Sequence, residues 1–71
     1  MESFARRIQI LRIISRRRFE TVGNLANELN VTDRTIKNDI LFLMAPELGF
    51  GIYTVQGRCG GVYAVEGWTF G

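Results

Sequence analysis

The sequence predicts a mainly α domain in which three helices are followed by a small β-hairpin. Three observations lead to this fold class. Apolar residues recur at helical spacing in three segments before residue 45, β-rich runs replace them from residue 52, and a stretch with three glycines in five residues separates two of these runs. At 71 residues the chain is long enough for one compact core, so we expect a single domain spanning residues 1–71.

The first helix is expected at residues 3–18. An apolar residue recurs there every three or four positions, which places a stripe on one helical face: Phe4, Ile8, Leu11 and Ile14. Ser3 is a candidate N-cap. The arginines at positions 16–18 suit the negative pole of the helix dipole, and either solvated charge or contact with phosphate would account for them.

A second helix is expected at residues 21–29 and a third at residues 33–44, with a sharp turn between them. Thr21 and Thr32 each precede an apolar helical pattern and can cap the free N–H groups that follow. Asn30 tolerates the left-handed backbone that a sharp turn after a helix requires. Two short helices joined in this way pack nearly at right angles, which leaves the second one protruding from the body of the protein.

The third helix has an apolar face and a polar face. Its apolar residues are assigned to the interior: Ile36, Ile40 and Leu43, with Leu41 and Met44 beside them. Pro46 disfavours helical geometry at the preceding residue, so the helix should end there. A protruding helix about 10–12 Å wide fits the major groove of B-DNA, which is about 12 Å across.

A β-hairpin is expected at residues 52–65, and its tip at residues 57–61 has the sequence GRCGG. We attribute the three glycines to positive φ angles, which glycine adopts readily. Tyr63 and Val65 alternate along the second strand and are assigned to the core. Cys59 at the tip is expected to have no role, because a reducing compartment disfavours an intermolecular disulfide.

The tail after the hairpin carries two aromatic residues, Trp68 and Phe70, in no regular pattern. Two interpretations are open for them. They fold back onto the sheet, or they form a dimer contact, since exposed aromatic side chains often mark interfaces.

Charge is unevenly distributed although the formal net charge is only +2. Residues 1–20 hold six arginines and two glutamates, a net charge of +4, whereas residues 21–71 carry −2. A basic end on a small domain indicates an anionic partner, either nucleic acid or a membrane surface. No apolar run approaches the roughly 20 residues of a membrane span, so the membrane alternative is a basic amphipathic first helix lying on lipid. That alternative requires the apolar face of the helix to be free.

Catalytic chemistry has little support in the sequence. The chain has no histidine and one cysteine, which removes the usual general base and prevents a disulfide framework or a zinc site. We therefore expect a cytoplasmic protein that is not an enzyme and holds no metal or cofactor. No site for a small-molecule effector is evident.

Residues 21–40 and the hairpin together resemble the DeoR-type winged helix-turn-helix domains of bacterial regulators and the related biotin-repressor-like domains. The resemblance covers about residues 5–65 and rests on these matches: Thr21-Val22, Leu25-Ala26, Leu29, Val31-Thr32, Arg34-Thr35-Ile36, Asp39-Ile40, Gly57, Gly60-Gly61 and Tyr63. It implies a three-helix winged helix-turn-helix fold, sequence-specific binding of double-stranded DNA and a role in transcription regulation. The helix at residues 33–44 would enter the major groove, and the wing at residues 56–61 would lie on the backbone or in the minor groove.

By the same resemblance six residues are candidates for DNA contact: Thr32, Arg34, Thr35, Lys37, Asn38 and Arg58. The two threonines would touch the DNA backbone near the start of the helix, where free N–H groups favour a phosphate. The arginine, lysine and asparagine of the helix would point towards base edges or phosphates. The arginine at the wing tip would reach a phosphate or the minor groove.

The sequence departs from the family pattern in two places. Lys37-Asn38 stands where the family commonly has two adjacent basic residues, and Asn24 stands where it often has an acidic one. Asp33 and Asp39 offset the two cations of the third helix, so we expect its exposed face to be close to neutral. DNA affinity would then depend on the wing arginine and on the arginines of the first helix. We expect Asp39 to bind a neighbouring basic group rather than DNA.

Two further questions stay open at this level. A winged helix can also serve as a protein-interaction module in a larger assembly, and a near-neutral third helix is compatible with that alternative. A homodimer is one expectation for a DNA-binding module, since two copies double the recognised sequence. Regulators of this family usually carry a sensor domain after the DNA-binding part, so the sequence is either a stand-alone DNA-binding protein or a piece of a longer regulator.

Overall fold

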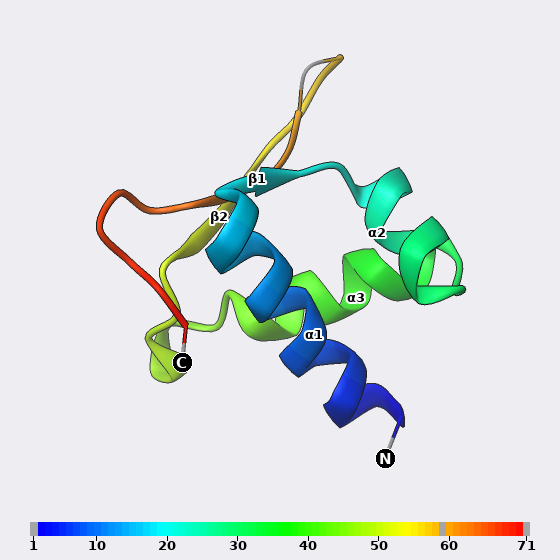
Figure 1. Ribbon diagram of the computed structural model, residues 1–71, viewed down its shortest axis with the longest axis horizontal. Helices are drawn as coiled ribbons and strands as arrows, with labels where there is room; N and C mark the ends of the chain where they lie inside the picture. Colours follow the sequence, from blue (N-terminus) through cyan, green and yellow to red (C-terminus); the bar gives the residue numbers. More distant parts are fainter. Residues whose placement is uncertain (1, 59, 71) are drawn as a thin grey trace.

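The computed structural model describes residues 2–58 and 60–70. Its elements in chain order are α1 (Glu2–Arg17), β1 (Phe19–Glu20), α2 (Val22–Leu29), α3 (Asp33–Leu43), the 3-10 helix η1 (Pro46–Leu48), β2 (Ile52–Val55) and β3 (Gly61–Ala64). The three α-helices gather beside a three-stranded antiparallel sheet with the strand order β1-β3-β2 (Figure 1). The predicted fold class, mainly helical with a small β element, is confirmed.

The first helix differs from the prediction at both ends. It begins at Glu2, so Ser3 lies inside its first turn and the predicted N-cap is wrong. The helix ends at Arg17 because Arg18 takes a left-handed backbone with φ 70°. The guanidinium of Arg18 donates to three carbonyl oxygens, those of Ser15 (2.8 Å), Val65 (2.9 Å) and Trp68 (2.6 Å). This arginine therefore belongs to the fold and is not merely a solvated charge at a helix end.

One strand, β1, was not predicted from the sequence. β1 has only two residues, in which Phe19 pairs with Tyr63 and Glu20 pairs with Val62 of β3. Two residues cannot show the alternation by which a strand is recognised in a sequence. The strand forms because the outer edge of the hairpin offers backbone groups that need partners, and the predicted hairpin thus becomes a three-stranded sheet.

The turn between α2 and α3 forms as predicted. The Oγ1 atoms of Thr21 and Thr32 accept the backbone N–H groups of Asn24 (3.1 Å) and Thr35 (3.2 Å). Asn30 caps the end of α2 in a left-handed conformation with φ 60°. These caps satisfy backbone groups that would otherwise have no partner at the helix ends, and they fix the points where α2 ends and α3 begins.

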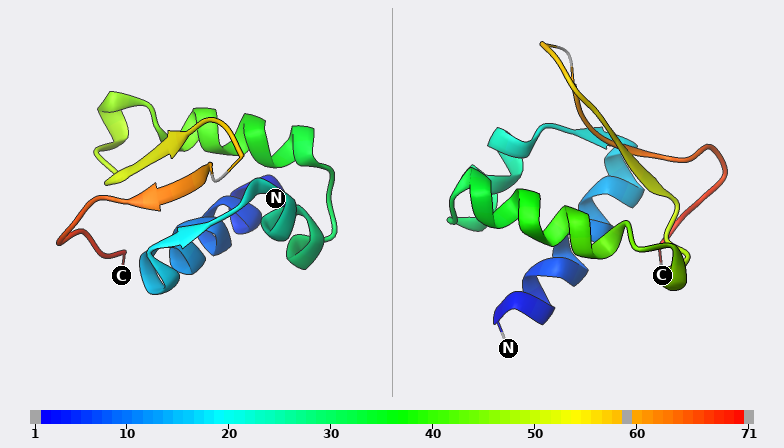
Figure 2. Two further views of the ribbon diagram at one scale, coloured as in Figure 1. Left: turned by 90° about the horizontal axis from the view of Figure 1, so that it is seen from above. Right: turned by 180° about the vertical axis from the view of Figure 1, so that it is seen from behind.

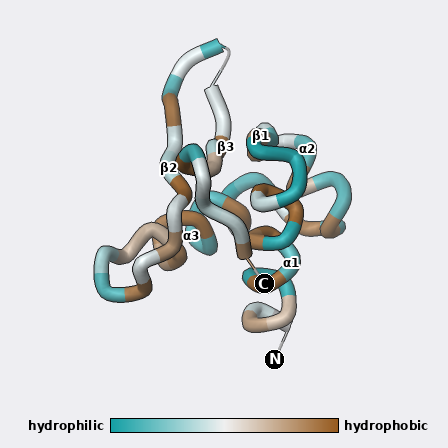
Figure 3. Tube along the Cα trace, turned by 60° about the vertical axis from the view of Figure 1, so that its left-hand side comes forward, coloured by the Kyte–Doolittle hydropathy of each residue, from teal (hydrophilic) through white to brown (hydrophobic). Residues whose placement is uncertain are grey.

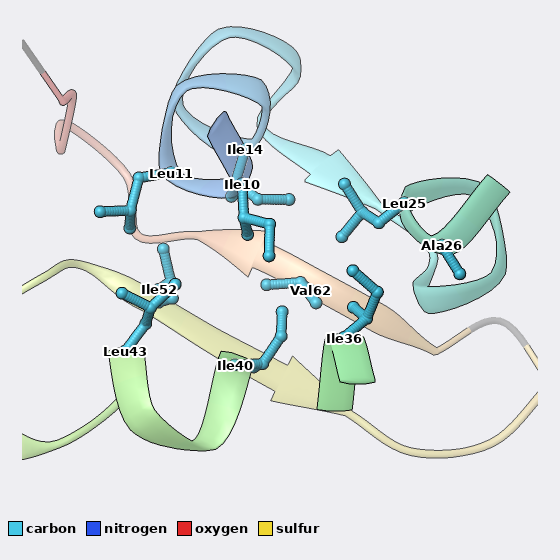
Figure 4. Packing of buried hydrophobic residues seen from close by; sticks show 10 residues of the cluster. All are labelled: Ile10, Leu11, Ile14, Leu25, Ala26, Ile36, Ile40, Leu43, Ile52 and Val62. Atoms are coloured by element: carbon cyan, nitrogen blue, oxygen red, sulfur yellow. The ribbon is translucent and has the colours of Figure 1, made fainter. Parts of the chain in front are cut away.

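One apolar core joins all three helices to the sheet (Figure 4). Its members are Ile10, Leu11, Ile14, Leu25, Ala26, Ile36, Ile40, Leu43, Ile52 and Val62. Two predicted assignments to the apolar side are wrong, because Phe4 is 66% exposed and Leu41 is 69% exposed. The first turns of α1 project beyond the body (Figure 1), so Phe4 has no core to join.

Half of the apolar face that the membrane-surface alternative requires is occupied by the core. Of its four residues, Leu11 and Ile14 are completely buried and Ile8 is half-buried, whereas Phe4 is exposed. In the described part of the chain, no helix has the length and apolar character needed to cross a bilayer.

The three glycines of the hairpin have two different causes. Only Gly57 has a positive φ, 113°. Gly60 and Gly61 are needed for close backbone approach: a Cβ would lie 2.1 Å from the carbonyl oxygen of Val55 at the first position and 2.7 Å from that of Glu20 at the second. The single explanation by positive φ is therefore wrong for two of the three. Cys59 lies outside the described residues.

Side chains on the outer face of the sheet also differ from the prediction. Val65 follows β3 and is exposed, so its assignment to the core is wrong. Tyr63 lies on the outer face between two aromatic rings, with ring centroids 4.5 Å from Phe19 and 5.5 Å from Tyr53. These three residues are cross-strand partners in register, and such aromatic pairs stabilise a sheet.

The tail folds back onto the protein. The backbone N–H of Phe70 donates to the Oγ of Ser15 at 2.8 Å, and the Phe70 ring lies 5.9 Å from that of Phe50. Trp68 packs over Gly51, where an added Cβ would lie 2.6 Å from the indole Cγ. The two tail aromatics thus fold back as one interpretation expected, but their contacts are with α1 and residues 50–51 rather than with the strands of the sheet.

The close approach at Gly61 gives a testable prediction. We expect Gly61→Ala to lower the free energy of unfolding by about 1–3 kcal/mol, because the methyl group would collide with the Glu20 carbonyl and the Phe19 ring. Gly23→Ala is the matched control: its Cβ would meet nothing within 4 Å, and alanine in a helix gains about 0.5–1 kcal/mol over glycine. Urea denaturation should thus shift the two variants in opposite directions, and a common direction would contradict the steric explanation.

Candidate nucleic-acid interface

The outward face of α3 is open. Thr32, Arg34, Lys37 and Asn38 are exposed, and Thr35 is half-buried. When the molecule is seen from behind, α3 lies in front of α1 and no described segment crosses over it (Figure 2, right). Hydrophilic and hydrophobic residues alternate along the helices (Figure 3), as expected when one side faces the core and the other faces solvent.

The two threonine candidates lie together at the start of α3. Their hydroxyl oxygens are 3.0 Å apart, and the Oγ1 of Thr32 also accepts the N–H of Thr35. Both side chains are therefore placed by the capping interaction itself. This position is the positive pole of the helix dipole, which favours an anion.

A groove separates α3 from the wing, by which we mean the hairpin formed by β2, β3 and their connection. Lys37 and Leu41 line it on the helix side, and Thr54 and Arg58 line it on the wing side. Gly23, near the start of α2, is also a lining residue. The fold thus brings Lys37 and Arg58, which are distant in the sequence, to the same groove. Arg34 and Asn38 are not among its lining residues.

Leu41 is a surface residue that sequence reasoning assigned to the wrong side. It is 69% exposed and lies one helical turn beyond Lys37. The signal in the sequence was its spacing, because Leu41 is seven residues after Arg34 and three after Asn38, which places all three on one helical face. The hydrophobicity of Leu41 favours the interior, whereas its spacing indicates the exposed face.

Asp39 is the one charged residue of the described chain that the core encloses, with 1% of its surface exposed. Its Oδ1 accepts hydrogen bonds from Arg6 Nη2 (3.1 Å) and Arg7 Nε (2.9 Å), and its Oδ2 accepts one from Arg6 Nε. The expectation that Asp39 binds a neighbouring basic group is confirmed.

The expectation of a near-neutral outward face on α3 is wrong. Because Asp39 is buried, the only acidic residue left on that face is Asp33, against the two cations Arg34 and Lys37.

The environment of Asp39 acts on its pKa in two directions. Burial raises the pKa of the Asp39 carboxyl, whereas the hydrogen bonds and positive charges of Arg6 and Arg7 lower it. The arginines prevail, so the pKa of Asp39 lies below its ordinary value and the group is charged at neutral pH.

Most arginines of the first twenty residues are engaged within the fold. Arg6 and Arg7 bind Asp39, and Arg18 binds backbone carbonyls. Arg17 Nη1 donates at 2.7 Å to both Glu20 and Glu28, which ties the end of α1 to α2. Arg12 and Arg16 are exposed. That the arginines of the first helix contribute to DNA affinity stays a prediction.

The arrangement of these elements defines the class of the protein. A capped turn joins α2 to α3, whose outward face is open, and a β-hairpin follows as a wing, which is the winged helix-turn-helix fold. Residues 6–63 match the model of the family described as "HTH domain", and the chain belongs to this family of helix-turn-helix DNA-binding domains. Neither a curated protein nor a solved structure matches the chain significantly.

The lowered pKa of two carboxyl groups predicts how stability depends on pH. Hydrogen bonding by Asn24, together with the Thr21 N–H and Arg17, lowers the pKa of Glu20 in the same direction as that of Asp39. Since both groups bind protons more weakly when folded, their contribution is present above their unfolded pKa values, about 3.9 for Asp and 4.3 for Glu. It is lost as the pH falls through the folded values.

We therefore expect the free energy of unfolding, measured by urea denaturation between pH 7 and pH 2, to fall below about pH 4. Asp39→Asn should be less stable than the wild type at pH 7 and should show a smaller fall in acid. An acid profile identical to that of the wild type would contradict the role given to the Asp39 charge.

Proposed function

We propose that this chain is a sequence-specific DNA-binding domain of DeoR or biotin-repressor-like type that acts in transcription regulation. In this proposal α3 enters the major groove of double-stranded DNA and the wing contacts the backbone or the minor groove. The observation that carries the proposal is the open outward face of α3, which lies beside a wing bearing Arg58. A helix about 10–12 Å wide fits a groove about 12 Å across.

Four exposed residues of α3 would face the bases. Arg34, Lys37, Asn38 and Leu41 follow one another at the spacing i, i+3, i+4 and i+7, the same spacing by which a homeodomain helix reads the major groove. Arginine or lysine pairs with O6 and N7 of guanine, and asparagine pairs with N6 and N7 of adenine. Leu41 would contact a thymine methyl group, for which an exposed apolar side chain is suited.

The remaining candidates would position the domain on the backbone. Thr32 and Thr35 lie at the positive pole of α3, where a phosphate is favoured. Arg58 lies on the wing side of the protein groove that Lys37 also lines. From there it would reach a phosphate or the minor groove of the DNA. Two copies bound as a homodimer would contact half-sites about 34–36 Å apart.

A second candidate function is a protein-interaction module, and one observation favours it. Leu41 and Val55 line the groove and are both exposed apolar side chains. A partner helix or strand with an apolar face would bury them. This alternative predicts binding that is nearly independent of salt, whereas neutralising phosphates makes DNA binding weaker as salt rises.

Selection from a pool of random 30-base-pair duplexes tests the proposal. We expect the protein to enrich one sequence family, containing one or two half-sites, and to lose affinity steeply between about 50 mM and 200 mM salt. Fluorescence anisotropy with the enriched duplex measures both properties. Failure to enrich any sequence would contradict specific DNA binding and would favour the protein-interaction alternative.

The separate roles of α3 and the wing can be distinguished by two variants. Asn38→Ala should change the base preferred at one position of the enriched sequence, because it removes a contact to a base edge. Arg58→Ala is the comparison: it should weaken binding to enriched and random duplexes about equally and make the salt dependence shallower by about one unit of slope. Lys37→Ala belongs with the base-reading variants. Unchanged preference in both α3 variants would remove these residues from the base-reading set.

A further inference from the structure

We propose that Asp39 is a positioning residue for DNA recognition: through Arg6 and Arg7 it fixes the rotation of α3 about its own axis, and hence the direction in which the base-reading side chains point. This inference rests on the proposed function of α3. Asp39 itself is buried and does not face DNA.

The contacts between α1 and Asp39 are directional. Arg6 holds both carboxylate oxygens and Arg7 holds Oδ1, at 2.9 Å from its Nε. Charge-assisted hydrogen bonds of this kind depend on angle as well as distance. The apolar contacts of α3 do not, since burial of Ile36, Ile40 and Leu43 is favourable over a range of rotations. The carboxylate therefore supplies an orientation that the core alone leaves loosely defined.

Arg7 contacts α3 at a second point. Its guanidinium carbon lies 4.0 Å from the centroid of the Phe42 ring, within the range of a cation–π interaction. Phe42 is three residues after Asp39, so Arg7 touches the same flank of α3 about one turn further along. Two contacts on one flank oppose both rotation of α3 and sliding along its axis. The wing groove, lined by Lys37 and Leu41, lies on another side of the helix.

A small rotation of α3 would be enough to disturb base reading. A side-chain tip about 6 Å from the helix axis moves about 2 Å when the helix turns by about 20°. Hydrogen bonds to base edges weaken steeply over such a displacement. Asn38 directly precedes Asp39 in the chain, so the fixed carboxylate and the base-reading amide share one short stretch of helix.

Electrostatics alone predicts the opposite effect of removing the carboxylate. Asp39→Asn removes one negative charge and so raises the net charge by one, which should strengthen binding to any DNA. The positioning role predicts instead that affinity for the correct sequence falls. The measured quantity is therefore the specificity ratio, defined as the affinity for the duplex enriched by the wild type divided by the affinity for a random-sequence duplex of equal length.

We expect Asp39→Asn to lower the specificity ratio about tenfold, comparable to the loss of one correct base pair, while affinity for the random duplex stays equal or rises. All affinities are measured by anisotropy at a temperature where circular dichroism shows each variant to be fully folded. Arg7→Lys is the second variant. Lysine keeps the net charge, but its single ammonium group cannot bind Asp39 and lie over the Phe42 ring at the same time, as the Arg7 guanidinium does. Arg7→Lys should therefore also lower the specificity ratio.

Ile52→Val is the matched control, because it destabilises the core in β2 without touching the contact between α1 and α3. It should keep the wild-type ratio. If the wild type itself has a ratio near one, the proposed function fails. If the wild type discriminates but Asp39→Asn and Arg7→Lys keep its ratio, specific binding stands and the positioning role is overturned. Should Asp39→Asn not fold, Arg7→Lys decides.

Discussion

One shared core is the constraint on which the rest of this structure depends. In a chain of 71 residues, all three helices and two strands contribute side chains to the same apolar cluster. Each helix therefore has one side committed to the interior and one left to solvent. For α3 the committed side carries Ile36, Ile40 and Leu43, so the opposite side is outward by necessity. The open face on which DNA recognition would rest is a consequence of how the core is filled.

A buried charge adds orientation to this apolar framework. A carboxylate can stay ionised inside a protein only when cations and hydrogen bonds replace its hydration. Arg6 and Arg7 meet this requirement at Asp39, and in doing so they join the first helix to the third. Replacement of a buried ion pair by apolar residues often leaves stability unchanged or raises it. The value of such a pair is therefore better sought in the geometry that it defines than in the stability that it adds.

The accuracy of sequence reasoning varied with the range of the interactions involved. The caps at Thr21 and Thr32 and the left-handed Asn30 were predictable, because each depends on contacts within three or four residues. Strand β1 was not predictable, because its two residues become a strand only by pairing with a segment more than forty positions away. Among the candidate site residues, exposure of the α3 side chains followed from helical spacing. That Lys37 and Arg58 would line one groove followed only from the fold.

By itself, the sequence determined that three helices and a hairpin form, where the helices around the turn are capped, and that Ile36, Ile40 and Leu43 of α3 face inwards. Local hydrogen bonds and hydrophobic periodicity suffice for these features. Only the tertiary structure decided which arginines of α1 form ion pairs with Asp39, Glu20 and Glu28. It also decided that Gly60 and Gly61 lie too close to other backbone atoms to carry a side chain. The physical reason is that the ion pairs of a charged side chain, and the space available at a glycine, depend on the atoms within a few ångströms of it. In a folded chain those neighbours come from distant parts of the sequence.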